Sequence, residues 1–192
     1  MKKLFVCMVI MLMAVPGIAE QDTLIKGDAE YGGYIGPEAR YTIINGEGGF
    51  LMGARAGLIY NHFFSLGIAG YGLASNVDAD SPYGDRNLMM GYYGLVPEYV
   101  FNPGRIVNVA LSALIGGGGV RVNDPATGNM NHNMDAFFAA EPQLSFYVNV
   151  VKYFRVGVGA GYRFTRGVDR KGLSDSEAGG FTAGLALQFG VF

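Results

Sequence analysis

Two histidines are the residues best suited to acid–base catalysis, because imidazole gains and loses a proton near neutral pH. His62 lies in a short turn, and His132 lies in an asparagine-rich segment. A small enzyme acting on membrane lipid would need a histidine, a serine and a carboxylate on one surface. Neither histidine shares a strand phase with both other groups. The sequence therefore predicts no enzyme; the alternative, a lipid-modifying enzyme, requires an activity that is lost in His132→Ala.

Metal-binding chemistry has little support in the sequence. Asp78, Asp80 and Asp85 resemble part of a calcium site, but their segment lacks the bidentate glutamate and the internal order of a calcium-binding loop. The only cysteine, Cys7, lies in an apolar stretch at the start of the chain. Disulfides and cysteine-bound metals are therefore not expected after that stretch. We predict no metal and no cofactor.

Seven charged residues are notable because each lies within an otherwise apolar or small-residue stretch. They are Glu38, Arg40, Arg55, Glu98, Glu141, Arg155 and Arg163. Carboxylates and guanidiniums that leave water must pair, since an unpaired buried charge costs several kcal/mol. Arginine suits this pairing because its planar fork can bridge two carboxylates. Whether the seven residues meet depends on the elements that carry them.

The stretches that carry these charges alternate between two kinds of residue. From Phe154 to Phe164 every second residue is apolar, and the residues between them are glycine or arginine. Successive side chains of a strand point to opposite faces, so this pattern predicts a strand with one apolar face. Eight segments share the pattern: 30–45, 48–60, 63–75, 87–101, 105–122, 136–150, 153–166 and 179–192.

The connections between the predicted strands alternate in length. Short turns follow the second, fourth and sixth strands, whereas the other connections are the hairpin loop at 45–48 and the longer polar segments 76–86, 123–135 and 167–178. An antiparallel up-and-down order places all the short turns at one end, which is the usual asymmetry of outer-membrane barrels. Aromatic residues near the short turns predict a membrane-interface girdle there: Tyr60, Phe63, Phe64, Phe101, Tyr153 and Phe154.

The alternation fits two barrels that are inside-out versions of each other. A soluble lipocalin-like periplasmic carrier turns its apolar face inward, whereas a membrane barrel turns that face to lipid. The other face of these strands is mostly Gly, Ala and Ser with a few Glu and Arg. Glycine on a water-facing surface would weaken the sheet, while the crowded interior of eight strands has room for few large side chains. The sequence therefore favours an all-β, eight-stranded antiparallel up-and-down transmembrane β-barrel.

The start of the chain has the form of a secretory signal peptide. Lys2 and Lys3 precede an apolar run of about a dozen residues, and Gly17 and Ala19 supply small residues before a cleavage point. We therefore predict a signal peptide at 1–19, an N-terminal periplasmic segment at 20–29 and the barrel at 30–192. Without the two lysines the formal charge falls from −2 to −4. This acidic balance gives no support to nucleic-acid binding.

With its export signal, eight alternating strands, loop asymmetry and Phe192, the chain resembles the small OmpA/OmpX-type outer-membrane barrels of Gram-negative-type bacteria. The resemblance covers the mature chain and implies an integral protein with a structural or surface-interaction role. It also implies outer-membrane lipid as surroundings and the barrel-assembly machinery as a partner in biogenesis, for which Phe192 resembles the recognition signal. One departure is that Phe192 is out of phase with Phe189. The resemblance indicates no surface ligand.

An inward-facing polar phase would place the seven charged residues in the lumen, the interior of the barrel. They would then form either a gated polar path or a salt-bridged plug, and the plug is favoured because eight strands leave little free bore. Pro37, Pro97 and Pro142 each adjoin one of the glutamates. Proline donates no backbone hydrogen bond and is usually kept to edges or bulges. We therefore predict a β-bulge at each proline, next to the charges.

Overall fold

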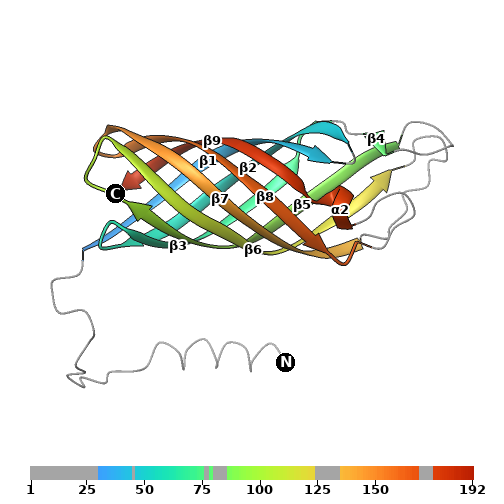
Figure 1. Cartoon of the computed structure of the whole chain (residues 1–192), viewed down its shortest axis with the longest axis horizontal. Coiled ribbons are helices and arrows are strands. Elements are labelled where there is room, and N and C mark those ends of the chain that lie inside the picture. Colours follow the sequence, from blue (N-terminus) through green and yellow to red (C-terminus); the bar gives the residue numbers. More distant parts are fainter. Residues whose placement is uncertain (1–29, 45, 76–77, 80–85, 124–134, 169–174) are drawn as a thin grey trace, which may run out of the picture.

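The period-two alternation corresponds to eight long antiparallel strands that close into a barrel (Figure 1). The computed structural model describes residues 30–44, 46–75, 78–79, 86–123, 135–168 and 175–192. The predicted signal peptide and the segment 20–29 lie outside the described residues. The long strands are β1 (Tyr31–Ile44), β2 (Glu47–Tyr60), β3 (Phe64–Leu73), β5 (Arg86–Phe101), β6 (Val107–Asn123), β7 (Asp135–Val151), β8 (Phe154–Arg166) and β9 (Gly180–Val191).

Each long strand pairs with the next long strand in the chain, and one further pairing, between the first and the last, closes the circle. β1 pairs with β9 and β3 pairs with β5, so every long strand has two partners. A two-residue strand, β4 (Asp78–Ala79), extends the sheet beside β5, and a one-turn helix, α2 (Asp175–Ala178), precedes β9. The described residues include no helix long and apolar enough to cross a membrane. The predicted all-β, eight-stranded up-and-down architecture is confirmed, with strand bounds that differ by a few residues.

The three prolines do not mark bulges, so that prediction is wrong. Pro37, Pro97 and Pro142 each pair in regular register with one neighbouring strand, opposite Ala54, Leu66 and Ala113. On the other side two successive pairs are missing, but the register is the same before and after each gap. Proline lacks a backbone N–H, so it removes a ladder hydrogen bond without inserting an extra residue. In the described ladders the register shifts only between Asn149 and Val151.

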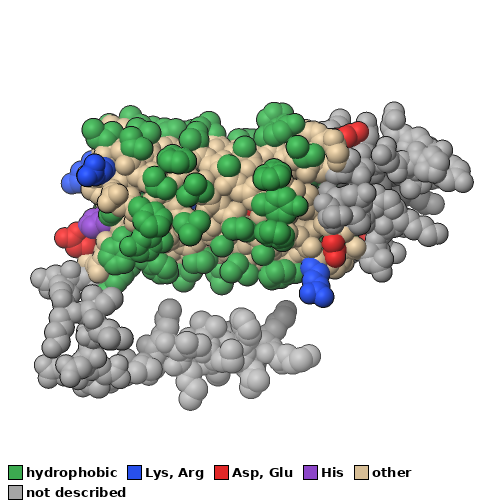
Figure 2. Space-filling view, in the orientation of Figure 1, with side chains coloured by type: hydrophobic (Ala, Val, Ile, Leu, Met, Phe, Trp, Pro, Cys, Tyr) green, Lys and Arg blue, Asp and Glu red, His purple; other side chains and the backbone are tan. Residues whose placement is uncertain are grey.

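The two faces of the sheet have opposite character. The outward face carries the large apolar side chains, and Figure 2 shows them spread along the barrel wall with charged side chains near its two ends. Ile35, Ile68 and Leu95 are each more than half exposed, whereas Arg55 and Glu141 are buried in the lumen. The apolar face therefore points outward. The structure excludes the lipocalin-like arrangement, in which that face would line an internal pocket.

Aromatic side chains form contacts near both ends of the wall. At the short-turn end, Tyr31 packs on Tyr60 and Phe154 stacks on Phe189, with ring centroids 5.6 and 4.8 Å apart. At the long-loop end the contacting pairs are Tyr41–Phe50, Tyr162–Phe164 and Tyr162–Phe181. Aromatic rings favour the boundary between an apolar phase and water. The sequence predicted aromatic residues only at the short-turn end, so the second ring is a finding of the structure.

Candidate functional site

The seven charged residues that sequence analysis singled out all lie inside the barrel, and each is at most 4 % exposed. They form two groups along the barrel axis. The loop-side cluster contains Glu38, Arg40, Glu141 and Arg163. The turn-side cluster, nearer the short turns, contains Arg55, Glu98 and Arg155. β1, β2, β5, β7 and β8 supply these residues, so only closure of the sheet brings them together.

Arg40 joins the two carboxylates of the loop-side cluster. Its Nη2 donates to Glu38 Oε2 at 2.9 Å and its Nη1 donates to Glu141 Oε1 at 2.5 Å. The guanidinium also lies 3.9 Å from the ring centroid of Tyr71. A planar guanidinium is suited to this geometry because its donors point in fixed, divergent directions. Arg40 thus partly neutralises both carboxylates, although Glu141 lies 101 residues from it in the sequence.

Hydroxyl groups donate further hydrogen bonds to these carboxylates. Tyr71 donates to Glu38 Oε2 at 2.5 Å, and Tyr92 donates to Glu141 Oε2 at 2.8 Å. Thr182 of β9 donates to Glu141 Oε1 at 2.9 Å. Buried charges are tolerated when further hydrogen bonds satisfy their remaining lone pairs. These hydroxyl groups therefore stabilise the buried carboxylates by hydrogen bonding.

Arg163 links the lumen to the connection that precedes β9. Its Nε donates to the backbone carbonyl of Ala178 in α2 at 3.0 Å, and its Nη2 donates to Thr42 Oγ1 at 3.2 Å. Asp175 holds the same connection, because its Oδ1 accepts from the backbone N–H of Val168 at 2.7 Å. Among the described residues, the oxygens bound to Arg163 are neutral. The guanidinium therefore anchors α2 against the barrel wall.

Glu98 is the single carboxylate of the turn-side cluster. Its Oε2 accepts from Arg55 Nη2 and from the Tyr147 hydroxyl, both at 3.0 Å. Its Oε1 lies 3.5 Å from Arg155 Nη2. Arg155 Nε donates to Gln188 Oε1 at 2.6 Å, and its guanidinium lies 4.2 Å from the ring centroid of Tyr147. Two guanidiniums therefore share one carboxylate, and aromatic rings and an amide supply the rest of their contacts.

Sequence reasoning missed the uncharged members of both clusters. These are Tyr34, Tyr71, Tyr92, Tyr147, Thr182 and Gln188, all of which are buried. The signal was available, because Tyr92 shares the inward phase of Glu98, and Tyr147 shares that of Glu141. Their hydroxyl contacts depend on the register between strands, which a single sequence does not specify.

Phe192 lies on the inner side of the wall, in keeping with its shift of phase. Its ring stacks on Tyr34 with centroids 6.4 Å apart and lies 4.2 Å from the guanidinium carbon of Arg155. Phe189 and Val191, by contrast, are about half exposed on the outer face. Phe192 therefore belongs to the turn-side cluster. Its resemblance to an assembly signal stays a prediction.

The candidate catalytic and metal-binding residues form no site in the described part of the chain. His62 lies in the turn between β2 and β3, and its Nε2 pairs with the exposed carboxylate of Glu30. No group of three or more potential metal ligands occurs among the described residues. His132, Asp80 and Asp85 lie outside those residues, and only the backbone of Asp78 is described.

A pair of adjacent tyrosines tests the loop-side cluster. Tyr92 is 2 % exposed and its hydroxyl bridges Glu141 and Arg163, whereas Tyr93 is 73 % exposed on the outer face. Tyr92→Phe leaves a buried carboxylate oxygen without its donor, so we expect the free energy of unfolding to fall by about 1–3 kcal/mol. Tyr93→Phe should change it by less than about 0.5 kcal/mol. Urea unfolding followed by circular dichroism in detergent micelles measures both, and equal effects would contradict the assignment.

Comparison with known proteins identifies solved structures that have a similar fold. No protein-family model and no curated protein sequence matches the chain. The N-terminal β-barrel domain of Pseudomonas aeruginosa OprF matches with a TM-score of 0.61 and 12% identity, over 85% of this chain and 99% of that domain. The P. aeruginosa outer membrane protein OprG matches with 0.60 and 9%, over 86% and 98%. Neisserial surface protein A matches with 0.57 and 12%, over 86% and 99%.

These matches extend over nearly the whole of each compared barrel. At such low identities they establish the architecture and not a shared activity. The chain has the fold of the small, eight-stranded OmpA/OmpX-type outer-membrane barrels. Each of the three named structures is similar to this chain in the path of its strands.

Proposed function

We propose that this chain is an integral outer-membrane protein that spans the bilayer as a closed barrel, with a structural or surface-interaction role. The observation that carries the proposal is the inverted distribution of polarity, in which charged residues fill the lumen and large apolar side chains cover the wall. A protein in water would leave this wall exposed to solvent at a high cost in free energy. Hydrocarbon surroundings remove that cost. Aromatic pairs at both ends of the wall, and the fold itself, support the same location.

Buried side chains occupy the lumen at the two charged clusters and at the loop end. Beyond the loop-side cluster, apolar side chains from six strands form a buried layer that includes Ile44, Leu51 and Phe137. The rings of Tyr71 and Tyr92 lie side by side just below it, with centroids 5.4 Å apart. Eight strands enclose an interior just wide enough for side chains to fill. The proposed state of the barrel is therefore closed, with the Glu/Arg network as a plug and not a conducting path.

Membrane fractionation tests the proposed location. We expect the protein in the outer-membrane fraction after export, with an electrophoretic mobility that changes when the folded sample is boiled. A closed sheet keeps its shape in detergent until heat separates the strands, so boiling should alter the migration. Recovery in the soluble fraction, with one heat-insensitive band, would overturn the proposal.

Planar-bilayer recording tests the proposed closure. We expect the folded protein, inserted in a bilayer, to give no stepwise current in potassium chloride solution, because the side chains leave no continuous water path. The same preparation must first show the heat-dependent mobility, which demonstrates that the barrel is folded. Regular current steps from folded protein would contradict the plug and would favour a gated path.

A role in enzymatic lipid modification is the less supported alternative. His62, the one histidine among the described residues, lies on a turn, and its side-chain hydrogen bond is with Glu30 and not with a serine hydroxyl. The proposed surface role rests instead on the connections at the long-loop end, which in such barrels form the extracellular loops. The chemical nature of a partner is not assigned.

A further inference from the structure

The turn-side cluster carries an excess of positive charge. In the loop-side cluster two guanidiniums, Arg40 and Arg163, are matched by the carboxylates of Glu38 and Glu141. In the turn-side cluster Arg55 and Arg155 share Glu98, the one carboxylate in ion-pair contact with them among the described residues. Arg55, Glu98 and Arg155 are at most 3 % exposed. A net buried charge of this kind is costly unless a counter-charge accompanies it.

The same cluster holds several buried donors without a hydrogen-bond partner. They are Arg55 Nε, Arg155 Nη2, Gln188 Nε2 and the Tyr34 hydroxyl. The orientation of Gln188 follows from its neighbour, because Arg155 Nε can only donate and the Gln188 carbonyl must face it. The amide nitrogen of Gln188 is therefore left over as a donor. The two other unpartnered buried side-chain oxygens among the described residues lie elsewhere, on Glu38 and Asn149.

The strand register brings these donors to one side of the barrel. Arg155 pairs with Gln188 across β8 and β9, and Gly36 pairs with Arg55 across β1 and β2. Gly36 lies beside Gln188, since a Cβ on this glycine would be 2.9 Å from the Gln188 Cα. Gly36 thus carries no side chain in the row between Gln188 and Arg55, and the backbone of β9 approaches it closely.

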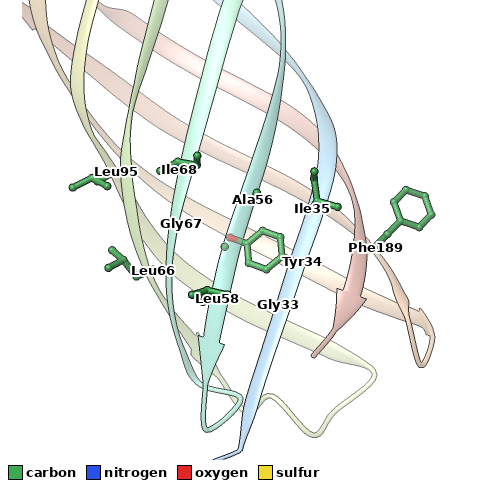
Figure 3. Close-up of a pocket in the computed structure, with 11 residues that line it drawn as sticks. Gly33, Tyr34, Ile35, Ala56, Leu58, Leu66, Gly67, Ile68, Leu95 and Phe189 are labelled. Carbon is green, nitrogen blue, oxygen red and sulfur yellow. The ribbon is translucent and has the colours of Figure 1, made fainter. Parts of the chain in front are cut away.

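Tyr34 covers the same region from β1. Its ring centroid lies 5.2 Å from the guanidinium carbon of Arg155 and 5.7 Å from that of Arg55. Figure 3 shows the ring with its hydroxyl directed toward β2, where a Cβ on Gly57 would be 3.1 Å from that oxygen. Phe192 and Tyr147 also pack on Arg155. Three aromatic rings therefore pack beside the two guanidiniums that carry unpartnered donors.

We propose that the turn-side cluster binds one small monovalent anion, of the halide class, inside the barrel wall. Unpartnered N–H and O–H donors are groups that can bind an anion, and two guanidiniums beside one carboxylate supply the matching charge. A cation is disfavoured by that charge. A divalent anion would give the cluster a net negative charge instead of neutralising it. The inference concerns the lumen and goes beyond the proposed location and role of the barrel.

Replacing the amide of Gln188 by a carboxylate tests the proposal. Gln188→Glu places a carboxylate beside Arg155 and supplies internally the charge that the anion would bring. Gln143→Glu is the matched control, because it makes the same chemical change on β7, where Gln143 bonds to Ser145 away from the two guanidiniums. The full-length folded protein is compared with both variants in sodium chloride and in sodium gluconate of equal ionic strength. All three must first show the heat-dependent mobility of a folded barrel.

We expect chloride to raise the urea midpoint of the wild-type protein and of Gln143→Glu relative to gluconate. A ligand bound only by the folded state stabilises it by mass action, so chloride at ten times its dissociation constant should shift the folding equilibrium about tenfold. Gln188→Glu should unfold at the same urea concentration in both salts. Equal midpoints for the wild type in both salts, or an undiminished chloride effect in Gln188→Glu, would overturn the proposal.

Bromide provides a second readout that does not depend on the variants. Crystals of the wild-type protein grown or soaked in sodium bromide should show an anomalous peak within hydrogen-bond distance of Arg155 Nη2 and Gln188 Nε2. Density at that position without anomalous signal would indicate water and would overturn the proposal even if the salt experiment showed a difference.

Discussion

Glu98→Gln is expected to lower the free energy of unfolding by about 3–5 kcal/mol, the usual cost of removing one partner from a buried ion pair. The substitution keeps the size of the side chain but leaves Arg55 and Arg155 without an ion-pair partner among the described residues. It also weakens the hydrogen bond that Tyr147 donates to Glu98. Urea unfolding of the folded protein in micelles, followed by circular dichroism, measures the loss.

Two further variants identify the cause of that loss. Glu30→Gln removes a carboxylate that pairs with His62 at the surface, and it should change stability by less than about 0.5 kcal/mol. Replacing Glu98, Arg55 and Arg155 together by Leu, Met and Met should recover much of the stability, because a buried ionic group can be replaced by apolar residues at little cost. A Glu98→Gln protein as stable as the wild type would show that the turn-side charges are not held out of water.

Gly36→Ala is expected to destabilise the barrel by about 3 kcal/mol, the upper part of the range for overpacked sites. A Cβ at this position would lie 1.7 Å from the backbone oxygen of Leu187. That oxygen belongs to β9, so the methyl group can be admitted only if β1 and β9 move apart. These two strands form the seam that joins the two ends of the sheet. We therefore expect Gly36→Ala to lose the heat-dependent mobility shift at lower urea than the wild type.

Gly72→Ala is the matched control for Gly36→Ala. A Cβ on Gly72 meets nothing within 4 Å. Without a clash, alanine restricts the unfolded chain and should leave stability unchanged or raise it by up to about 1 kcal/mol. Equal losses for both variants would mean that strand glycines matter here only through general strand propensity, and the close approach of β1 and β9 would be refuted.

The direction of the apolar face was predictable from composition, whereas the fine structure of the strands was not. Glycine, alanine and serine between large apolar residues indicate a crowded interior and an apolar exterior. The prediction of a bulge at each proline was wrong, because Pro37, Pro97 and Pro142 lose a ladder hydrogen bond without a change of register. The barrel has many other ladder bonds on either side of each gap. These hold the register where an isolated hairpin would slip.

The identity of the buried charged residues followed from their phase, but their pairing did not. Alternation indicated that Glu38, Arg40 and Glu141 face the same way, since side chains of one phase share a face. It could not indicate that Arg40 contacts Glu141, 101 residues later, or that tyrosines donate to both carboxylates. Those contacts depend on strand tilt and on the stagger between neighbouring strands, which closure of the sheet determines.

The sequence by itself determined the number of strands, the side of each strand that carries charge, and the end at which the short turns lie. These properties are local, because a two-residue period and a turn can be recognised within a few residues. The tertiary structure alone decided how seven charges divide into a balanced cluster and a positive one, and that Phe192 turns inward against Arg155. Both outcomes arise from contacts across the lumen, between strands that meet only when the barrel closes.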